Sequence, residues 1–149
     1  MEIREILRSL REKHALTQEQ LADRVLVTRQ AVSRWETGET QPNTDTLKLL
    51  SREYNVSINT LLGSPRTLIC QCCGMPLTDD EMISREKDGS FNEDYCKWCY
   101  TDGAFTYESK ESLLSFLLRN VPNPDGTLEE TRREQFDRGL SQLKHWKEQ

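Results

Sequence analysis

Four of the five cysteines fall into two Cys-x-x-Cys pairs, which is the residue pattern in this chain with the clearest chemistry. Cys70 and Cys73 form the first pair, Cys96 and Cys99 form the second, and 22 residues separate the two. Each pair can grip a metal ion from a tight turn, and two pairs supply the four thiolates of a tetrahedral zinc site. The spacing therefore predicts one structural Zn²⁺ per chain.

Cys72 is left over from this pattern. It could compete in the first pair as a Cys-x-Cys alternative with Cys70, although we interpret it as a free thiol beside the site. An exposed thiol there could be oxidised and then draw in a ligand cysteine, which would expel the metal. A zinc or thiol redox sensor acting through Cys72 is therefore an alternative function.

A second stretch with possible chemistry is TRQAVSRWE, residues 28–36. Thr28 has the hydroxyl that a helix N-cap needs, and Ala31, Val32 and Trp35 recur at helical spacing as one apolar stripe. Arginine can bind guanine and glutamine can bind adenine in a DNA major groove, so a helix here could read base edges. The side chains predicted to face outward are Arg29, Gln30, Ser33 and Arg34.

Helical periodicity and capping residues place this stretch third among five helices in residues 1–62. The first helix begins near Ile3 and ends near Lys13. Thr17 caps the second helix, with a capping-box partner at Gln20. Only Leu26 and Val27 separate the second helix from Thr28, which is the spacing of a helix-turn-helix. Further caps at Asn43 or Thr44 and at Ser57 predict the last two helices.

The rest of the chain divides into a linker at 63–67, a small β ribbon at 68–107 and a helical tail at 108–149. Lys87-Asp88-Gly89-Ser90 is a hairpin signal between the cysteine pairs. Ser109 should cap a first tail helix, and Thr127 with Glu130 should open a long second one. The apolar positions of that second helix are Phe136, Leu140, Leu143 and Trp146. The aromatic residues expected to pack around the knuckles are Tyr95, Trp98, Tyr100 and Phe105.

Residues 3–62 resemble the five-helix domain of the phage-repressor, or Cro/Xre-type, regulators. The resemblance lies in the LTQEQLA segment, the SRWETGE segment and the closing VSINTLL. It implies that Arg29, Gln30 and Arg34 meet base edges, that Gln18 contacts a phosphate and that Thr37 and Gly38 approach the DNA backbone. Leu26 departs from the family, which usually has glycine in this turn. If the backbone has positive φ there, leucine costs on the order of 1 kcal/mol.

Residues 68–107 and the late LKHW resemble a family of small bacterial zinc ribbons, on the evidence of CQCCGMPL and DYCKWCYTDGAF. Such ribbons are often appended to other domains, and the family implies no defined activity. Cys72 departs from the small polar residue expected at its position.

Charge is unevenly distributed, with a net formal charge of -5 for the 149 residues. Residues 1–62 carry 9 basic and 9 acidic side chains, 63–107 carry 4 against 8, and 108–149 carry 7 against 8. The acidic excess therefore lies downstream of the helix-turn-helix. No apolar run approaches the roughly 20 residues that span a bilayer, and a secretory signal is absent, so we expect a cytoplasmic protein with no membrane partner.

These observations predict a mainly α protein with a five-helix DNA-binding domain, then a small β zinc ribbon with C-terminal helices. We expect a sequence-specific transcriptional regulator that binds double-stranded DNA as a homodimer, held partly by residues 109–147. An alternative is a DNA-tethered adaptor whose ribbon recruits a protein partner. An enzyme is not expected, because four cysteine ligands close the zinc shell and leave no open position for a substrate or water.

Overall fold

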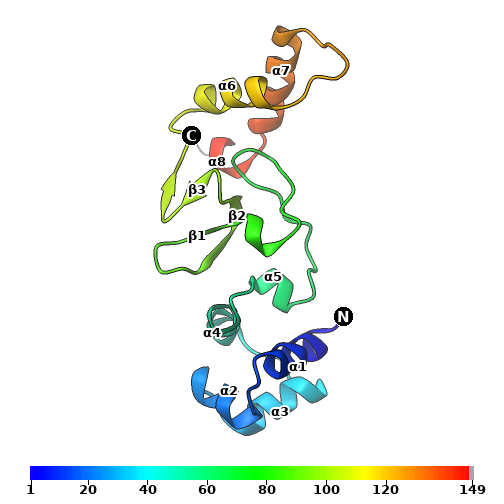
Figure 1. Cartoon of the computed structure of the whole chain (residues 1–149), viewed down its shortest axis with the longest axis vertical. Helices are drawn as coiled ribbons and strands as arrows, with labels where there is room; N and C mark the ends of the chain where they lie inside the picture. Colours follow the sequence, from blue (N-terminus) through cyan, green and yellow to red (C-terminus); the bar gives the residue numbers. More distant parts are fainter. Residues whose placement is uncertain (148–149) are drawn as a thin grey trace. The chain divides into compact units, whose positions relative to one another are not determined.

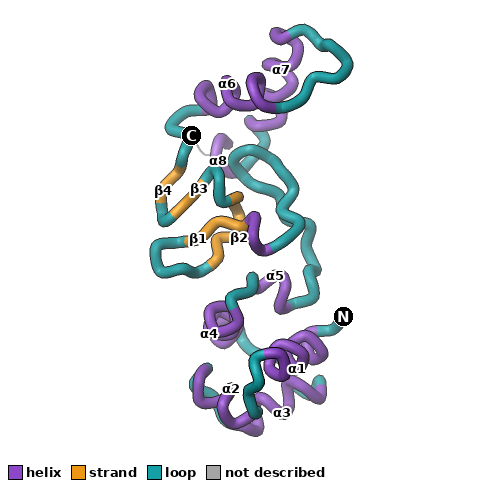
Figure 2. Tube along the Cα trace, viewed as in Figure 1, coloured by secondary structure: helices purple, strands orange, loops and turns teal. Residues whose placement is uncertain are grey.

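The computed structural model describes residues 1–147, and the chain divides into two compact units. The first consists mainly of Met1–Thr67 and the second mainly of the residues from Leu68 onward. Figure 2 shows helices and loops in the first unit, and a short helix, then strands and then further helices in the second. The fold is therefore mainly helical with a small β region, as the sequence predicts. No helix in the described part of the chain has the length and apolar character needed to cross a membrane.

The first unit contains five helices, and local side-chain caps fix where four of them begin (Figure 1). The hydroxyls of Thr17, Thr28 and Ser57 and the amide of Asn43 each accept a bond from the backbone N–H three residues on. These caps are the ones expected from the sequence, because capping depends on residues within one turn. The helices are α1 (Ile3–Lys13), α2 (Gln18–Arg24), α3 (Arg29–Thr37), α4 (Thr44–Tyr54) and α5 (Ile58–Leu61).

One apolar core holds these helices together. Helix α3 contacts both α1 and α2, and its buried Val32 and Trp35 lie in the core. The opposite face of α3 is thereby left toward solvent. The other buried core residues are Leu7, Leu16, Leu21, Ala22, Val25, Leu50, Tyr54 and Leu61.

The second unit begins with two small sheets. The first pairs β1 (Ile83–Arg85) with β2 (Phe91–Cys96), and the second pairs β3 (Tyr100–Thr101) with β4 (Ala104–Phe105). A short 3₁₀ helix, η1 (Asp80–Met82), precedes β1. Asp102 and Gly103 both have positive φ, which is the backbone of a two-residue turn between antiparallel strands. The second cysteine pair adjoins these strands, since Cys96 ends β2 and Cys99 precedes β3, whereas the first pair lies in the turn between the bridged residues Ile69 and Pro76.

Three helices follow the ribbon: α6 (Lys110–Asn120), α7 (Glu129–Leu140) and α8 (Lys144–Lys147). Ser109 caps α6 as expected, but the predicted Thr127 cap of the next helix is wrong. Thr127 instead bonds to Asn123 and Asp125 within the preceding loop, and α7 begins after Leu128 without a side-chain cap. The loop satisfies its own polar groups and thus competes with the cap.

The expected long final helix is also broken, because α7 ends at Leu140 and α8 restarts at Lys144. The hydroxyl of Ser141 donates to the carbonyl of Asp137, 2.8 Å away, at the point where α7 ends. The restart brings Leu143 to within 3.6 Å of the position that a Cβ on Gly74 would take. Packing against the first knuckle therefore overrides the helical periodicity of the segment.

Leu26 lies in the turn between α2 and α3 with φ +59°, so the positive φ considered for this position is present. Its side chain is 83% exposed and contributes little burial. We expect Leu26→Gly to raise the free energy of unfolding of the first unit by roughly 0.5–1 kcal/mol, because glycine adopts this backbone without steric cost. Urea unfolding followed on α-helical signals measures the change. Leu26→Ala is the matched control, since it keeps a Cβ and should give no comparable gain.

Candidate metal centre and nucleic-acid interface

The first knuckle is a tight turn built around Cys70. The backbone N–H groups of Cys72 and Cys73 point at the Cys70 Sγ, 3.4 and 3.5 Å away, and Gly74 N donates to the Cys70 carbonyl at 2.8 Å. Gly74 has φ +81°, a backbone region that glycine adopts at little cost. Local backbone bonds therefore hold the first pair of sulfurs on one side of the turn.

The second knuckle follows β2 directly. Cys99 N donates to the Cys96 carbonyl at 3.2 Å, and the Cys99 carbonyl accepts from Thr106 N at 2.9 Å. The second bond joins the end of the knuckle to the residue after β4. The β3–β4 hairpin thus closes the second knuckle and fixes the direction of its sulfurs.

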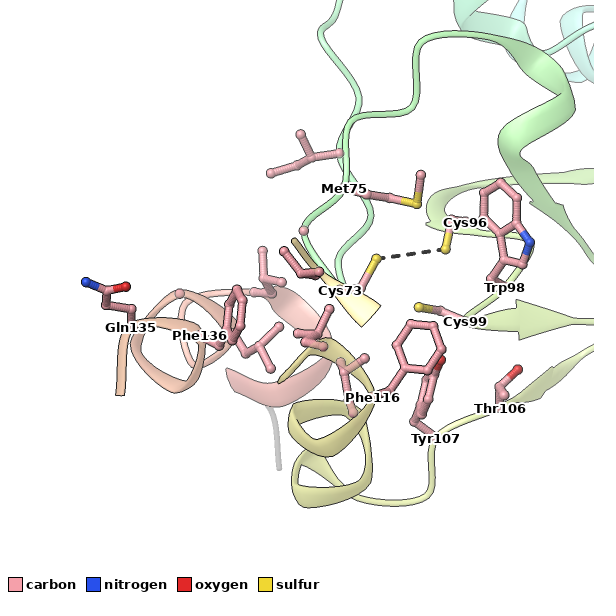
Figure 3. Close-up of a pocket in the computed structure, with 18 residues that line it drawn as sticks. Cys73, Met75, Cys96, Trp98, Cys99, Thr106, Tyr107, Phe116, Gln135 and Phe136 are labelled. Carbon is pink, nitrogen blue, oxygen red and sulfur yellow. Dashed lines mark hydrogen bonds between the residues drawn. The ribbon is translucent and has the colours of Figure 1, made fainter. Parts of the chain in front are cut away.

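The two knuckles bring four sulfur atoms together. The sulfurs of Cys70, Cys73, Cys96 and Cys99 all lie within 4.8 Å of one another, and no other group of metal-binding side chains converges this way within residues 1–147. Cys73 Sγ and Cys96 Sγ are 3.9 Å apart (Figure 3). Zn–S bonds of 2.3 Å in a tetrahedron place sulfurs about 3.8 Å apart, so the cluster fits Zn²⁺. Bound zinc would be structural, because thiolates occupy all four positions.

The sulfurs influence one another electrostatically in opposite directions. Hydrogen bonds from Cys73, Cys96 and Cys99 lower the pKa of Cys70. Hydrogen bonds between Cys99 and the other cysteines, that with Cys70 first, raise the pKa of Cys99. Thiols this close cannot all ionise unless a cation compensates their charge. A divalent ion bound by all four removes that conflict, which is a second reason that the donor set suits zinc.

The expectation of an exposed thiol at Cys72 is wrong. Its side chain is fully buried, at 0% exposure, and it is not one of the four clustered sulfurs. Its carbonyl accepts a bond from the indole N–H of Trp146 at 2.7 Å. Oxidation from solvent therefore has no direct route to Cys72 in the folded ribbon.

Helix α8 is attached to the first knuckle by this bond and by its backbone. His145 N donates to the Gln71 carbonyl at 3.1 Å, and Lys144 N donates to the Gln71 side-chain oxygen at 3.2 Å. Lys144 Nζ also lies 3.0 Å from an Asp94 carboxylate oxygen. The bond from Trp146 to the first knuckle is not evident from the sequence, although Trp146 belongs to the LKHW segment of the ribbon resemblance.

Three of the four ribbon aromatics form one cluster. Tyr95 has its ring centroid 4.9 Å from Phe105 and 5.5 Å from Tyr100, and His145 stacks on Phe105 at 4.1 Å. Trp98 does not join them and remains 52% exposed. The expected aromatic packing thus holds for Tyr95, Tyr100 and Phe105 and is wrong for Trp98.

The outward face of α3 carries the residues singled out in the sequence. Arg29, Gln30 and Arg34 are exposed, whereas Ser33 is half-buried. Thr28 and Thr37 are also exposed, but both hydroxyls bond locally, Thr28 to Ala31 N and Thr37 to the Arg34 carbonyl. Arg34 also forms a surface ion pair with Glu39, 3.9 Å away, but such exposed pairs are weak. The arginine and glutamine side chains are therefore the groups on this helix that are most available to a partner.

Gln18 is half-buried and already has a protein partner. Its side-chain amide donates to Glu36 at 3.0 Å, and Arg11 binds the same carboxylate with two bonds of 2.5 and 3.1 Å. Burial alone would raise the pKa of Glu36, but the bonds from Arg11 and Gln18 outweigh it and lower the pKa. This group ties α1 and the start of α2 to α3. Glu36 was missed in the sequence because its partners Gln18 and Arg11 lie 18 and 25 residues away.

Comparison with known proteins matches both units to families. Residues 69–147 match a family described as "Putative zinc ribbon domain", and residues 7–61 match one described as "Helix-turn-helix". The chain is 47% identical over 63 residues to the HTH-type transcriptional activator BcrR of Enterococcus faecalis. It is 39% identical over 57 residues to the uncharacterized HTH-type transcriptional regulator YobD of Bacillus subtilis.

These alignments cover only part of each protein. They include 42% and 38% of this chain, and 31% of BcrR and 51% of YobD. Among solved structures, the P22 c2 repressor in complex with a synthetic operator is 35% identical, with a TM-score of 0.41. That match covers 42% of this chain and 94% of the repressor chain.

Removal of the metal should unfold the ribbon and leave the first unit folded. Zinc binding supplies on the order of 10 kcal/mol of folding free energy to small ribbons, so a strong chelator should unfold residues 68–107. The helical core of residues 3–62 contains none of these ligands and should persist. Residue-resolved NMR before and after chelation measures both outcomes, and an unchanged ribbon spectrum after complete metal removal would contradict the prediction.

A matched pair of cysteine variants provides the control. Cys72→Ala removes a buried sulfur that lies outside the cluster and should retain one zinc per chain. Cys73→Ala removes a clustered sulfur and should weaken zinc binding strongly. Equal zinc content in the two variants would mean that the four ligands have been misassigned.

Proposed function

We infer that this chain, which belongs to the family described as "Putative zinc ribbon domain" and also carries a helix-turn-helix domain, is a sequence-specific DNA-binding transcriptional regulator with a structural zinc ribbon. The observation that carries the proposal is the exposed Arg29, Gln30 and Arg34 on α3, opposite its buried Val32 and Trp35. Such a regulator would act in the cytoplasm on double-stranded DNA, and it requires no catalytic site.

The proposed roles of the site residues follow from their surroundings. Arg29, Gln30 and Arg34 would read base edges, with Ser33 contributing at shorter reach. Thr28 and Thr37 would lie near the DNA backbone at the two ends of α3. Gln18, at the N-terminus of α2, would contact phosphate while its amide keeps its bond to Glu36. The Arg11–Glu36 pair would then hold the reading helix in place.

We propose that the chain binds DNA as a homodimer on a near-palindromic site. Two-fold symmetry would place two recognition helices about 34 Å apart on one face of the duplex. The relative BcrR is named a transcriptional activator, which supports a role in regulation for this chain.

A second candidate function is that of a DNA-tethered adaptor. The observation that favours it is Trp98, which is 52% exposed on the ribbon. An adaptor would still bind its protein partner after Arg29, Gln30 and Arg34 are neutralised. A regulator that has no protein partner would bind no protein in the same experiment. A DNA-free pull-down with the neutralised variant separates the two.

The DNA prediction concerns three single variants. Arg29→Ala, Gln30→Ala and Arg34→Ala should each weaken binding to the preferred site by roughly 1–3 kcal/mol and relax preference at one base pair. Gln18→Ala should weaken all sequences about equally, because phosphate contacts carry no sequence information. DNA selection on the purified protein, followed by titration of each variant, gives these values.

Arg8→Ala is the matched control for loss of one positive charge. Arg8 is 65% exposed on α1, pairs with Glu12 and is not one of the residues proposed to contact DNA. Its removal should leave base preference intact. If the triple variant of Arg29, Gln30 and Arg34 keeps the wild-type preference, α3 is not the reading helix.

The dimer prediction concerns Leu128, the N-cap residue of α7, whose side chain is 75% exposed. Leu128→Asp removes this apolar surface and supplies the missing helix cap, so α7 should not be destabilised. We expect wild-type dimers at micromolar concentration and a weaker dimer for the variant, both measured by light scattering. A wild-type monomer under these conditions would refute the homodimer.

A further inference from the structure

A largely apolar pocket of about 880 Å³ lies within the second unit and extends to the sulfurs of the metal centre, three of which line it (Figure 3). The knuckles form one wall, and α6 and α7 form another. Apart from three cysteines of the metal centre, the lining residues, all of which fall within the described part of the chain, carry no charge. Its volume lies in the range of small-molecule sites, roughly 300–1,000 Å³.

Four aromatic side chains contribute to the surface of this pocket, together with aliphatic ones. Trp98, Tyr107, Phe116 and Phe136 all line it, and Trp98 and Phe116 are 52% and 44% exposed. Aromatic rings pack favourably against other rings in offset or edge-on arrangements. An apolar lining also disfavours a charged ligand, which would lose its hydration without gaining a partner. The pocket therefore suits an uncharged aromatic molecule.

The metal ligands differ in their access to this pocket. Cys73, Cys96 and Cys99 line it, whereas Cys70 does not. Cys96 and Cys99 are at most 2% exposed, but Cys73 is half-buried and keeps some accessible surface. Figure 3 shows the Cys73 sulfur turned toward the Cys96 sulfur, 3.9 Å away. A molecule in the pocket would thus meet Cys73 before any other sulfur of the cluster.

The sulfurs also differ in their hydrogen bonds. Cys70 Sγ accepts from two backbone N–H groups, at 3.4 and 3.5 Å, and this withdraws electron density from it. Cys73 Sγ lies 3.9 Å from Cys96 Sγ and, within residues 1–147, accepts no backbone N–H. Cys73 is therefore the most accessible cysteine of the cluster, and its sulfur is less weakened as a nucleophile than that of Cys70.

We propose that this pocket is a site at which uncharged aromatic electrophiles with an activated double bond react with Cys73. The Cys73 thiolate attacks the β-carbon, a C–S bond forms, and the π electrons move onto the activating carbonyl as an enolate. Water then protonates the α-carbon, so no oxidant or reductant is consumed. The product is a neutral thioether, a poorer metal ligand than the thiolate it replaces.

The expected consequence is confined to the ribbon. Cys73 shares the first knuckle with Cys72, whose carbonyl holds Trp146 of α8. Loss of one ligand should release zinc and loosen this attachment. The proposal does not depend on DNA binding by the first unit, so the two can fail independently.

The test uses the zinc-loaded full chain and two maleimides. N-phenylmaleimide is uncharged and aromatic, whereas N-(2-carboxyethyl)maleimide is anionic, and each rate is divided by the rate of the same reagent with glutathione. We expect the first adduct at Cys73 by peptide mass mapping, a normalised preference of roughly tenfold for the phenyl reagent, and zinc release at the rate of modification. A first adduct at another cysteine, or equal normalised rates, would overturn the proposal.

Gly139 provides the matched pair of variants. It lines the pocket on α7, and a Cβ added there meets no heavy atom within 4 Å. Gly139→Phe should occupy pocket volume and abolish the phenyl preference, while Gly139→Ala should retain it. A folded Gly139→Phe protein that keeps the preference would also overturn the proposal. If that variant does not fold, Phe116→Ala decides in its place, because loss of this wall should reduce the preference severalfold.

Discussion

The convergence of four sulfurs from two knuckles is the constraint on which the second unit depends. The sulfurs lie within 4.8 Å of one another, at a spacing where like charges repel unless a cation binds them. The surrounding strands are only two to six residues long and bury little apolar surface. The bonds from α8 to Gln71 and Cys72 presuppose the knuckle conformation. The position of the C-terminal helix therefore depends on the metal centre.

The fold of the first unit is held together without a metal. An apolar core fixes its five helices, and the buried Glu36 carboxylate joins Arg11 of α1 to Gln18 of α2 through α3. Breaking such a buried pair is expensive, because it leaves an unpaired charge away from water. The pair therefore acts mainly on the orientation of α3, the helix that would meet DNA. This separates the residues that hold the helix from those that would read bases.

Local rules allowed much of this architecture to be predicted from sequence. The caps at Thr17, Thr28 and Ser109 and the two cysteine pairs were identifiable because their partners lie within a few residues. The wrong cap at Thr127 reflects competing bonds within its own loop, but the failures at Cys72 and in the final helix involve contacts between distant segments. The Cys72 side chain is buried, and the Cys72 carbonyl accepts a bond from Trp146, 74 residues away. The final helix breaks where it meets the knuckle. Sequence spacing likewise gave no sign of the pocket, since its walls come from residues 69 to 143.

The charge distribution acquires a physical meaning once the metal centre is included. Residues 63–107 contain 4 basic and 8 acidic side chains, and this count treats the cysteines as neutral. Four thiolates with one Zn²⁺ add two further negative charges, so the ribbon is strongly anionic when metal is bound. Phosphates repel such a surface, and this repulsion opposes sequence-independent association of the ribbon with DNA. In the proposed regulator, DNA affinity would then rest on the electrically balanced first unit, where the exposed arginines of α3 are concentrated at the reading surface.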